Sequence, residues 1–179
     1  MLEFKIIQRG NGLLALQNMP SQLNKAMKNA QRDVMKHLRA ELVRRTTTQY
    51  YITAARLRSA MRYTSSSILI SGARQLIHHY KLSPSKRGKR RTRPLMAAVK
   101  KGPLKPLGGN TFLFATSTGK QVAMRRLTRL RFPIEPVVSP AIPQLVSHPD
   151  ILEGLDADVE SMFNRRLEYW SLKAIGAAK

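Results

Sequence analysis

The sequence contains no cysteine, and this absence excludes disulfide bonds, thiolate metal sites and cysteine nucleophiles. It also has no apolar run approaching the ~18 residues that a membrane-spanning helix needs. Residues 1–8 alternate charged and apolar side chains, so they lack the continuous apolar core of a signal peptide. Together these absences predict a soluble protein with no membrane partner, made in a cytoplasm.

The largest absence is of acidic residues, because no Asp or Glu occurs between Leu42 and Ile134. The same stretch contains 21 Lys and Arg residues, and it carries nearly all of the formal net charge of +22. Charge this one-sided is costly in self-repulsion, so we expect an outside partner to compensate it. That partner is expected to be a polyanion or a protein surface rich in carboxylates.

The missing carboxylates also bear on catalysis. A hydrolase, nuclease or transferase normally needs a general base or a metal-binding carboxylate that converges with other groups. The basic stretch has no such residue, and the remaining acids gather near the expected start of a helix, where they favour the helix macrodipole. These are Asp150, Glu153, Asp156, Asp158 and Glu160. They could hold a metal ion only if they converged in space, so we expect no enzyme, no cofactor and no metal.

Apolar periodicity predicts an α+β fold in one domain over residues 1–179, with a small antiparallel sheet packed on a long N-terminal helix. Apolar side chains recur every three or four residues from Leu23 to Leu42, with charged residues opposite. This helix is expected to start at a cap on Ser21 and to end near Arg45, where three threonines follow. A C-terminal helix is expected over residues 155–174.

A short opening strand is expected near Phe4, and a short helix over residues 54–61, capped by Thr53, is expected after the long helix. The other strands are expected to follow this short helix. Alternation and β-branched content predict four or five antiparallel strands, the last two joined as a hairpin by a turn at Gly119. Their ranges are 63–70, 95–101, 111–116 and 121–127, and 75–82 is either a further strand, which its alternation favours, or a loop. Within them His78 and His79 are adjacent, so on a strand their rings point to opposite faces and cannot bind one metal together. We expect a partly buried or surface pair.

The extended basic loop at 83–93 contains no apolar residue except Pro84, so it cannot cover a core. Three interpretations stay open: contact with nucleic-acid phosphates, docking on an acidic protein, or a solvated loop. The loop lacks aromatic residues, so any nucleic-acid contact is expected to be independent of base sequence. The residues predicted to face DNA or an acidic partner are Lys86, Arg87, Lys89, Arg90, Arg91, Arg93, Lys100 and Lys101.

The passage from Thr111 to Val146 resembles the C-terminal signature of the minor tail protein Z family of long-tailed phages. In that family a Phe-Ala strand leads through a Gly-Lys turn to a strand ending in Arg, followed by an R-x-P-I step and a proline-rich segment. The matching residues are Phe114-Ala115, Gly119-Lys120, Arg125-Arg126, Arg131 to Ile134 and Ser139 to Leu145. The family usually has a Gly before its Pro-Ser pair, whereas Ser139-Pro140 follows two valines here.

The resemblance implies a structural virion protein that completes the head-proximal end of a phage tail. Such a protein is expected to form a homo-oligomer, a hexameric ring around the DNA channel, and to join the tail terminator or tail tube to neck and connector proteins. It is expected in the virion, and in the host cytoplasm during assembly, with possible non-specific contact with genomic DNA. Trp170 and Tyr169 are expected in the core or in a subunit contact.

A ring also needs segments that reach neighbouring subunits, and the candidates are the basic loop at 83–93 and the proline-rich arm at 132–149. The residues expected in such a contact are Arg131, Pro133, Ile134, Pro140, Ile142 and Pro143. The alternative hypothesis, from a different functional class, is that the chain is a stand-alone protein that binds nucleic acid independently of base sequence. The basic half of the chain serves both functions, and the number of copies that assemble distinguishes them.

Overall fold

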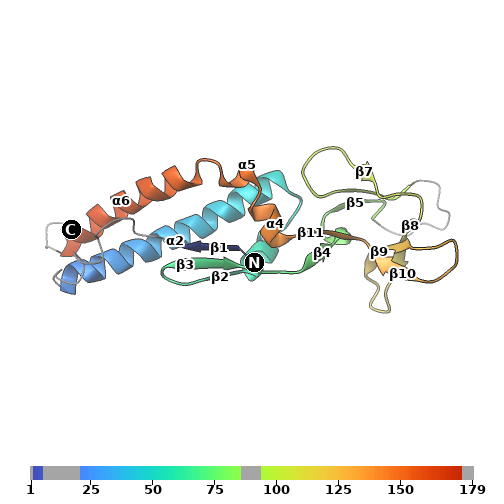
Figure 1. Ribbon diagram of the computed structural model, residues 1–179, viewed down its shortest axis with the longest axis horizontal. Helices are drawn as coiled ribbons and strands as arrows, with labels where there is room; N and C mark the ends of the chain where they lie inside the picture. The colour runs from blue at the N-terminus through green and yellow to red at the C-terminus, as the bar shows by residue number, and fades with distance from the viewer. Residues whose placement is uncertain (1, 6–20, 86–93, 175–179) are drawn as a thin grey trace.

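The computed structural model describes residues 2–5, 21–85 and 94–174. It has an α+β fold in which one long helix packs against small antiparallel sheets and a C-terminal helix, so the predicted fold class is confirmed. Figure 1 shows an elongated molecule, with the helices α2 (Ser21–Gln49) and α6 (Leu155–Ala174) side by side in one half and most of the short strands in the other.

Helix α2 buries the face that its periodicity predicts. Ala30, Val34, Leu38 and Leu42 are all buried, while the lysines of the opposite face are exposed and Arg39 is half-buried. Ser21, expected as the cap, is the first residue of the helix. The apolar face is covered by the sheet that contains β2 (Met61–Tyr63) and β3 (Ser67–Ile70) and by α6.

The predicted end of this helix near Arg45 is wrong, because α2 continues through the three threonines to Gln49. The Thr46 hydroxyl donates to the Leu42 carbonyl oxygen at 2.7 Å, and Thr48 makes the same bond to Arg44 at 2.9 Å. A threonine whose hydroxyl bonds back to the preceding turn is tolerated inside a helix. Thr46 is also buried, so packing holds the last turns in place.

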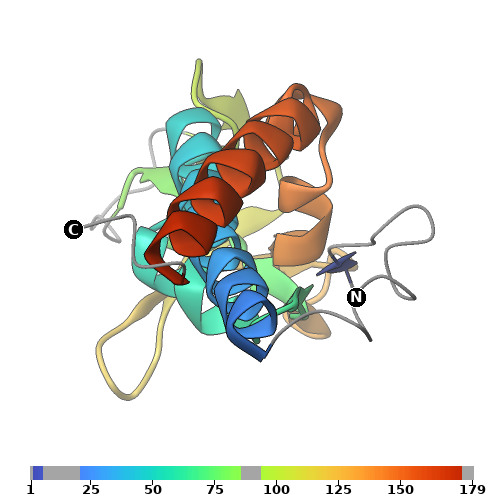
Figure 2. The same cartoon turned by 90° about the vertical axis from the view of Figure 1, so that its left-hand side faces the viewer.

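Helix α6 lies along α2, as Figures 1 and 2 show from two directions, and its bounds are those predicted. Only Leu155 at its start is fully buried, and Val159, Phe163 and Trp170 are half-buried. The indole Nε1 of Trp170 donates to Asp33 Oδ2 at 2.9 Å. This bond fixes the far end of α6 against the N-terminal half of α2.

The described strands form four small antiparallel sheets instead of one. In sheet order these are β1-β3-β2, β11-β4, β5-β6-β7 and β10-β9-β8. The bounds not yet given are β1 (Leu2–Lys5), β4 (Arg74–Leu76), β5 (Lys81–Ser83), β6 (Met96–Ala98), β7 (Lys105–Pro106), β8 (Thr111–Ala115), β9 (Gln121–Arg126), β10 (Ile134–Pro136) and β11 (Val138–Ala141). The hairpin of β8 and β9 around Gly119, whose φ is 76°, is confirmed.

Two predicted strands are broken by turns. The range 63–70 is a hairpin of β2 and β3, closed by a bond from the Thr64 amide to the Ser67 carbonyl at 2.8 Å. The range 75–82 contains β4, the 3₁₀ turn η1 (Ile77–His79) and β5. The turn places Ile77 and Tyr80 together in the core, which continuous strand alternation would prevent.

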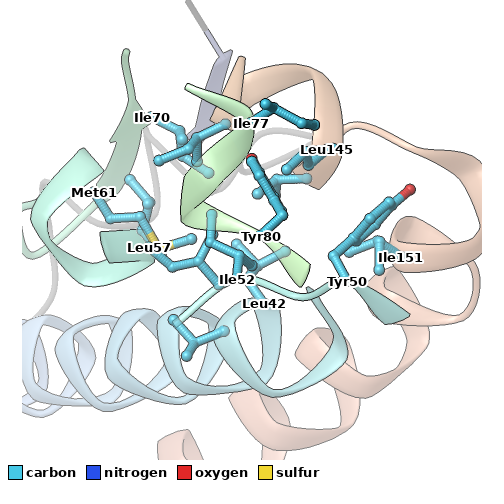
Figure 3. Packing of buried hydrophobic residues seen from close by; sticks show 14 of the residues in the cluster. Leu42, Tyr50, Ile52, Leu57, Met61, Ile70, Ile77, Tyr80, Leu145 and Ile151 are labelled. Atoms are coloured by element: carbon cyan, nitrogen blue, oxygen red, sulfur yellow. The ribbon is translucent and has the colours of Figure 1, made fainter. Parts of the chain in front are cut away.

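The core lies where α2 meets the short elements. Figure 3 shows side chains of α2, η1, α4 (Ile142–Val146) and the helix α3 (Ala54–Ala60) pointing toward one another. Thr53 occupies the cap position of α3, although its hydroxyl makes no capping bond. The helix α5 (Pro149–Leu152) adds Ile151 to the same cluster.

The proline-rich segment at 132–149 is part of the subunit's own fold. Strand β10 pairs with β9, β11 pairs with β4, and α4 buries three apolar side chains. This range therefore contains regular elements, two short strands, one short helix and the first residue of a second. Its prolines stand where a missing amide costs little, since Pro143 and Pro149 lie in the first turns of α4 and α5.

Replacing Val34 by Asp tests the central role of the buried face of α2. Val34 has no exposed surface, so Val34→Asp buries a charge without a partner, at a cost of several kcal/mol against a total stability of about 5–15 kcal/mol. We expect loss of soluble folding, measured by circular dichroism and gel filtration. Ala40→Asp, on the exposed side of the same helix, is the control and is expected to fold. A folded Val34→Asp variant would contradict the assignment.

Candidate polyanion-binding surface

The predicted basic residues fall into two groups. Lys86, Arg87, Lys89, Arg90, Arg91 and Arg93 lie outside the described residues. Lys100 and Lys101 are described, and both are exposed. The ammonium of Lys100 lies 3.1 Å from Asp150 Oδ2, and this hydrogen bond lowers the pKa of Asp150. Lys101 has an exposed side chain, and its amide donates to the Gln49 carbonyl at 2.7 Å.

The residues predicted to contact a neighbouring subunit are also divided. Arg131, Pro133 and Pro140 are exposed, and Ile134 and Pro143 are half-buried. Ile142 is 3% exposed and belongs to the subunit's own core, so it is not available to a neighbour.

Two of the exposed members, Arg131 and Pro133, belong to a feature that we call the β9–β10 loop, residues 127–133. This loop exposes Leu127, Leu130 and Phe132, with Leu130 at 71% and Phe132 at 63%. Arg129 and Arg131 are interleaved with these side chains, and the Arg131 guanidinium lies 5.7 Å from the centre of the Phe132 ring. The alternation of apolar and basic residues at 127–132 is the sequence signal that points to this surface. Contiguous exposed apolar side chains commonly mark an interaction site.

The acidic cluster serves the fold. Asp150, Asp156 and Asp158 stand in the first turns of α5 and α6, which confirms their interpretation as helix-start residues. In the described part of the chain no three His, Asp or Glu side chains converge as a metal site would require. None of the described helices combines the length and the apolar content needed to cross a bilayer.

Arg45 is the residue that connects this cluster to α2. Its guanidinium donates to Glu41 Oε1 at 2.8 Å, to the Ile151 and Glu153 carbonyls at 3.2 and 2.5 Å, and to Asp158 Oδ2 at 2.5 Å. Hydrogen bonds from Arg44, and then from Arg45, lower the pKa of Glu41 to about 2. The Arg45 side chain therefore connects α2 to the end of α5 and to the start of α6.

The two adjacent histidines lie on the turn η1, so the argument that they occupy a strand is wrong, while their partial burial is confirmed. Their ring centres are 4.1 Å apart. Burial, followed by the neighbouring charges of His78 and Arg56, lowers the pKa of His79 to about 4. Burial also lowers the pKa of His78. Both rings therefore stay neutral in the folded protein at neutral pH.

No protein-family model, no curated protein and no solved structure matches this chain. Over the described residues the surface offers exposed cations, an apolar loop that contains two arginines, and two kinds of carboxylate. Glu41, Glu135, Asp150 and Asp158 form ion pairs, whereas other exposed carboxylates along α6 form none among these residues.

Replacing Arg45 tests its role as the connection between the helices. Arg45→Met leaves the Ile151 and Glu153 carbonyls and the Asp158 carboxylate without the donor that Arg45 supplies, so we expect a loss of about 2 kcal/mol in the free energy of unfolding. Arg44→Ala is the matched control, because Arg44 also binds Glu41 but is exposed, and it is expected to cost clearly less than Arg45→Met. Urea unfolding of both variants measures the difference, and equal losses would contradict the assignment.

The neutral histidines predict a loss of stability in mild acid. Between pH 6.5 and about 4 the unfolded chain binds protons that His78 and His79 resist in the folded state, so stability falls as the pH falls through this window. The melting temperature is expected to drop between pH 7.5 and pH 5. His79→Gln is expected to reduce this dependence, whereas His37→Gln, on the exposed side of α2, is expected to retain it. An unchanged dependence in His79→Gln would contradict the explanation.

Proposed function

We propose that this protein is a structural component that completes the head-proximal end of a long-tailed phage tail. Copies of the chain form a closed ring around the DNA channel, with six subunits as the proposed number, and join the tail to neck proteins. The resemblance of residues 111–146 to the minor tail protein Z family supports the proposal. The acid-free stretch with its 21 cations supports it too, since a ring around DNA provides the compensating charge.

The observation that carries the proposal is the β9–β10 loop. Leu130 and Phe132 are exposed at one end of an elongated subunit, and Figure 1 shows β8, β9 and β10 at that end, far from the C-terminal end of α6. Burying such side chains against a neighbour yields about 1.5–3 kcal/mol each. The loop therefore supports a subunit contact.

The helical half of the subunit offers a complementary surface. Exposed carboxylates without an ion pair among the described residues lie just before α6 and along it, at Glu153, Asp156, Glu160 and Glu168. Arginines on the loop and carboxylates along α6 favour head-to-tail association. A head-to-tail contact forms a ring when the rotation between successive subunits closes, which the proposal requires.

A second candidate function is a stand-alone protein that binds nucleic acid without reading its sequence. The net charge of +22 favours it, because phosphate neutralisation supplies most of the affinity in non-specific binding. The candidates differ in assembly, since only the first requires a closed oligomer on a tail. Electron microscopy of particles carrying the labelled protein separates them. Label at the head-proximal tail end supports the first, and a monomer absent from particles supports the second.

The loop provides the mutational test of the ring. The double substitution Leu130→Ser and Phe132→Ser is expected to leave the melting temperature unchanged and to reduce incorporation into tails at least tenfold, because the contact loses its apolar area. Incorporation is measured by quantitative mass spectrometry of purified particles. Val138→Ser, which alters an exposed apolar side chain of β11, is the control and should incorporate normally. Normal incorporation of the double variant would exclude the loop from the contact.

A further inference from the structure

A pocket of about 200 Å³ lies between α2, α3 and β2, away from the β9–β10 loop. It is lined by Lys36, Arg39, Ala40, Arg58 and Tyr63. Three of these five residues are cations and none is an acid. Three like charges around one small pocket repel one another, so the pocket favours an anionic occupant.

Arg39 is held in place by the walls of the pocket. Its Nη2 donates to the Arg58 carbonyl oxygen at 3.0 Å, and its guanidinium carbon lies 5.3 Å from the centre of the Tyr63 ring. Its Nε is covered and has no hydrogen-bond partner among the described residues. Within the same residues no carboxylate forms an ion pair with Arg39, Lys36 or Arg58. The site therefore contains a positioned guanidinium whose charge is not neutralised.

The pocket is the end of a longer basic row. Lys25, Lys28, Arg32 and Lys36 follow one another along α2 at spacings of three or four residues, and all four are exposed. This spacing places them on one face of the helix, opposite the buried Ala30 and Val34. From Lys25 to Arg39 the row is about 21 Å long at ~1.5 Å per residue.

The two acids in this part of α2 are turned toward other partners. Asp33 accepts the indole hydrogen bond of Trp170 on α6, and Glu41 binds Arg44 and Arg45. The row is therefore a line of cations without an interleaved carboxylate. A line of this length fits an extended polyanion with regularly spaced charges better than it fits a single small anion.

We propose that the α2 row and the pocket bind the phosphate backbone of a nucleic acid, with one phosphate group held in the pocket by Arg39, Arg58 and Lys36. Guanidinium groups match the geometry of phosphate oxygens and can donate two bonds to them. The Tyr63 ring, exposed at the edge of the pocket, offers a surface for a sugar or a base. Contacts to phosphate carry no base information, so this binding is independent of sequence.

This inference deepens the proposed function, because it names where on the subunit DNA would be contacted. It rests on the proposed function in one respect, which is that the bound polyanion is DNA. It does not require the subunits to form a ring. RNA presents the same phosphodiester chemistry, so the experiment compares the two nucleic acids. An acidic protein presents carboxylates instead, and it is a separate outcome of the test.

The test measures binding of the full chain to labelled DNA and RNA duplexes of one mixed sequence by fluorescence anisotropy at several salt concentrations. The double variant Lys36→Ala, Arg58→Ala removes two exposed cations of the site. We expect affinity to fall at least tenfold, and the slope of log K against log salt to fall by about 1.8, since each phosphate contact contributes about 0.9. Ala40→Asp, which places a carboxylate in the pocket, is expected to weaken binding as well.

Lys105→Ala, Lys120→Ala is the matched control, because it removes the same net charge from exposed positions elsewhere. It is expected to change affinity less than twofold. Equal losses in the two double variants would overturn the proposal in favour of diffuse attraction. Polyglutamate that competes as well as the duplexes would overturn it in favour of an acidic protein partner. Tighter binding of DNA than of RNA supports a site that contacts DNA in the channel of the proposed ring. Tighter binding of RNA than of DNA assigns the site to RNA.

The outcome is independent of the test of the ring. Binding is measured on the isolated chain, whereas the ring is tested by incorporation into particles. Loss of the ring would leave the effect of Lys36→Ala, Arg58→Ala unchanged, and loss of the pocket effect would leave incorporation through the β9–β10 loop unchanged. Circular dichroism and melting temperatures of all variants show that each one is folded.

Discussion

Burial of one face of α2 is the constraint on which the structure depends. A helix of 29 residues whose partners are short strands and short helices is stable only when its apolar face is covered along its length. The sheet of β1, β3 and β2 covers part of that face, and α6 covers another part. The four small sheets are too short to be stable alone, so their positions follow from packing against α2 and against one another.

Charge is the second constraint, and it explains where the few acids are used. The chain has 10 acidic residues against 32 Lys and Arg, and several of the acids form ion pairs within the fold. Glu41 and Asp158 bind Arg45, Asp150 binds Lys100, and Glu135 binds Arg125. Acids used in this way cannot neutralise the outer face of α2. The protein therefore folds with its uncompensated cations outward, which is the state a polyanion-binding protein needs.

The two candidate surfaces serve different partners. The β9–β10 loop combines apolar side chains with arginines and suits a protein neighbour, whereas the α2 row combines cations with one aromatic ring and suits a phosphate backbone. They lie in different halves of the elongated molecule. A subunit whose β9–β10 loop contacts a neighbour and whose α2 row contacts DNA is consistent with the proposed tail-completion function.

The sequence alone determined the fold class, the two long helices and the hairpin at Gly119, because these depend on periodicity and turn residues that act over a few positions. Only the tertiary structure decided that α2 continues past Arg45, where buried Thr46 and the bonds of Arg45 to α5 and α6 override a local breaking signal. It also decided that His78 and His79 share a turn and that Ile142 is a core residue. The pocket around Arg39 could not be predicted, since Arg58 and Tyr63 reach it only when α3 and β2 fold back onto α2. Contacts between residues so distant in sequence depend on packing, which no local pattern encodes.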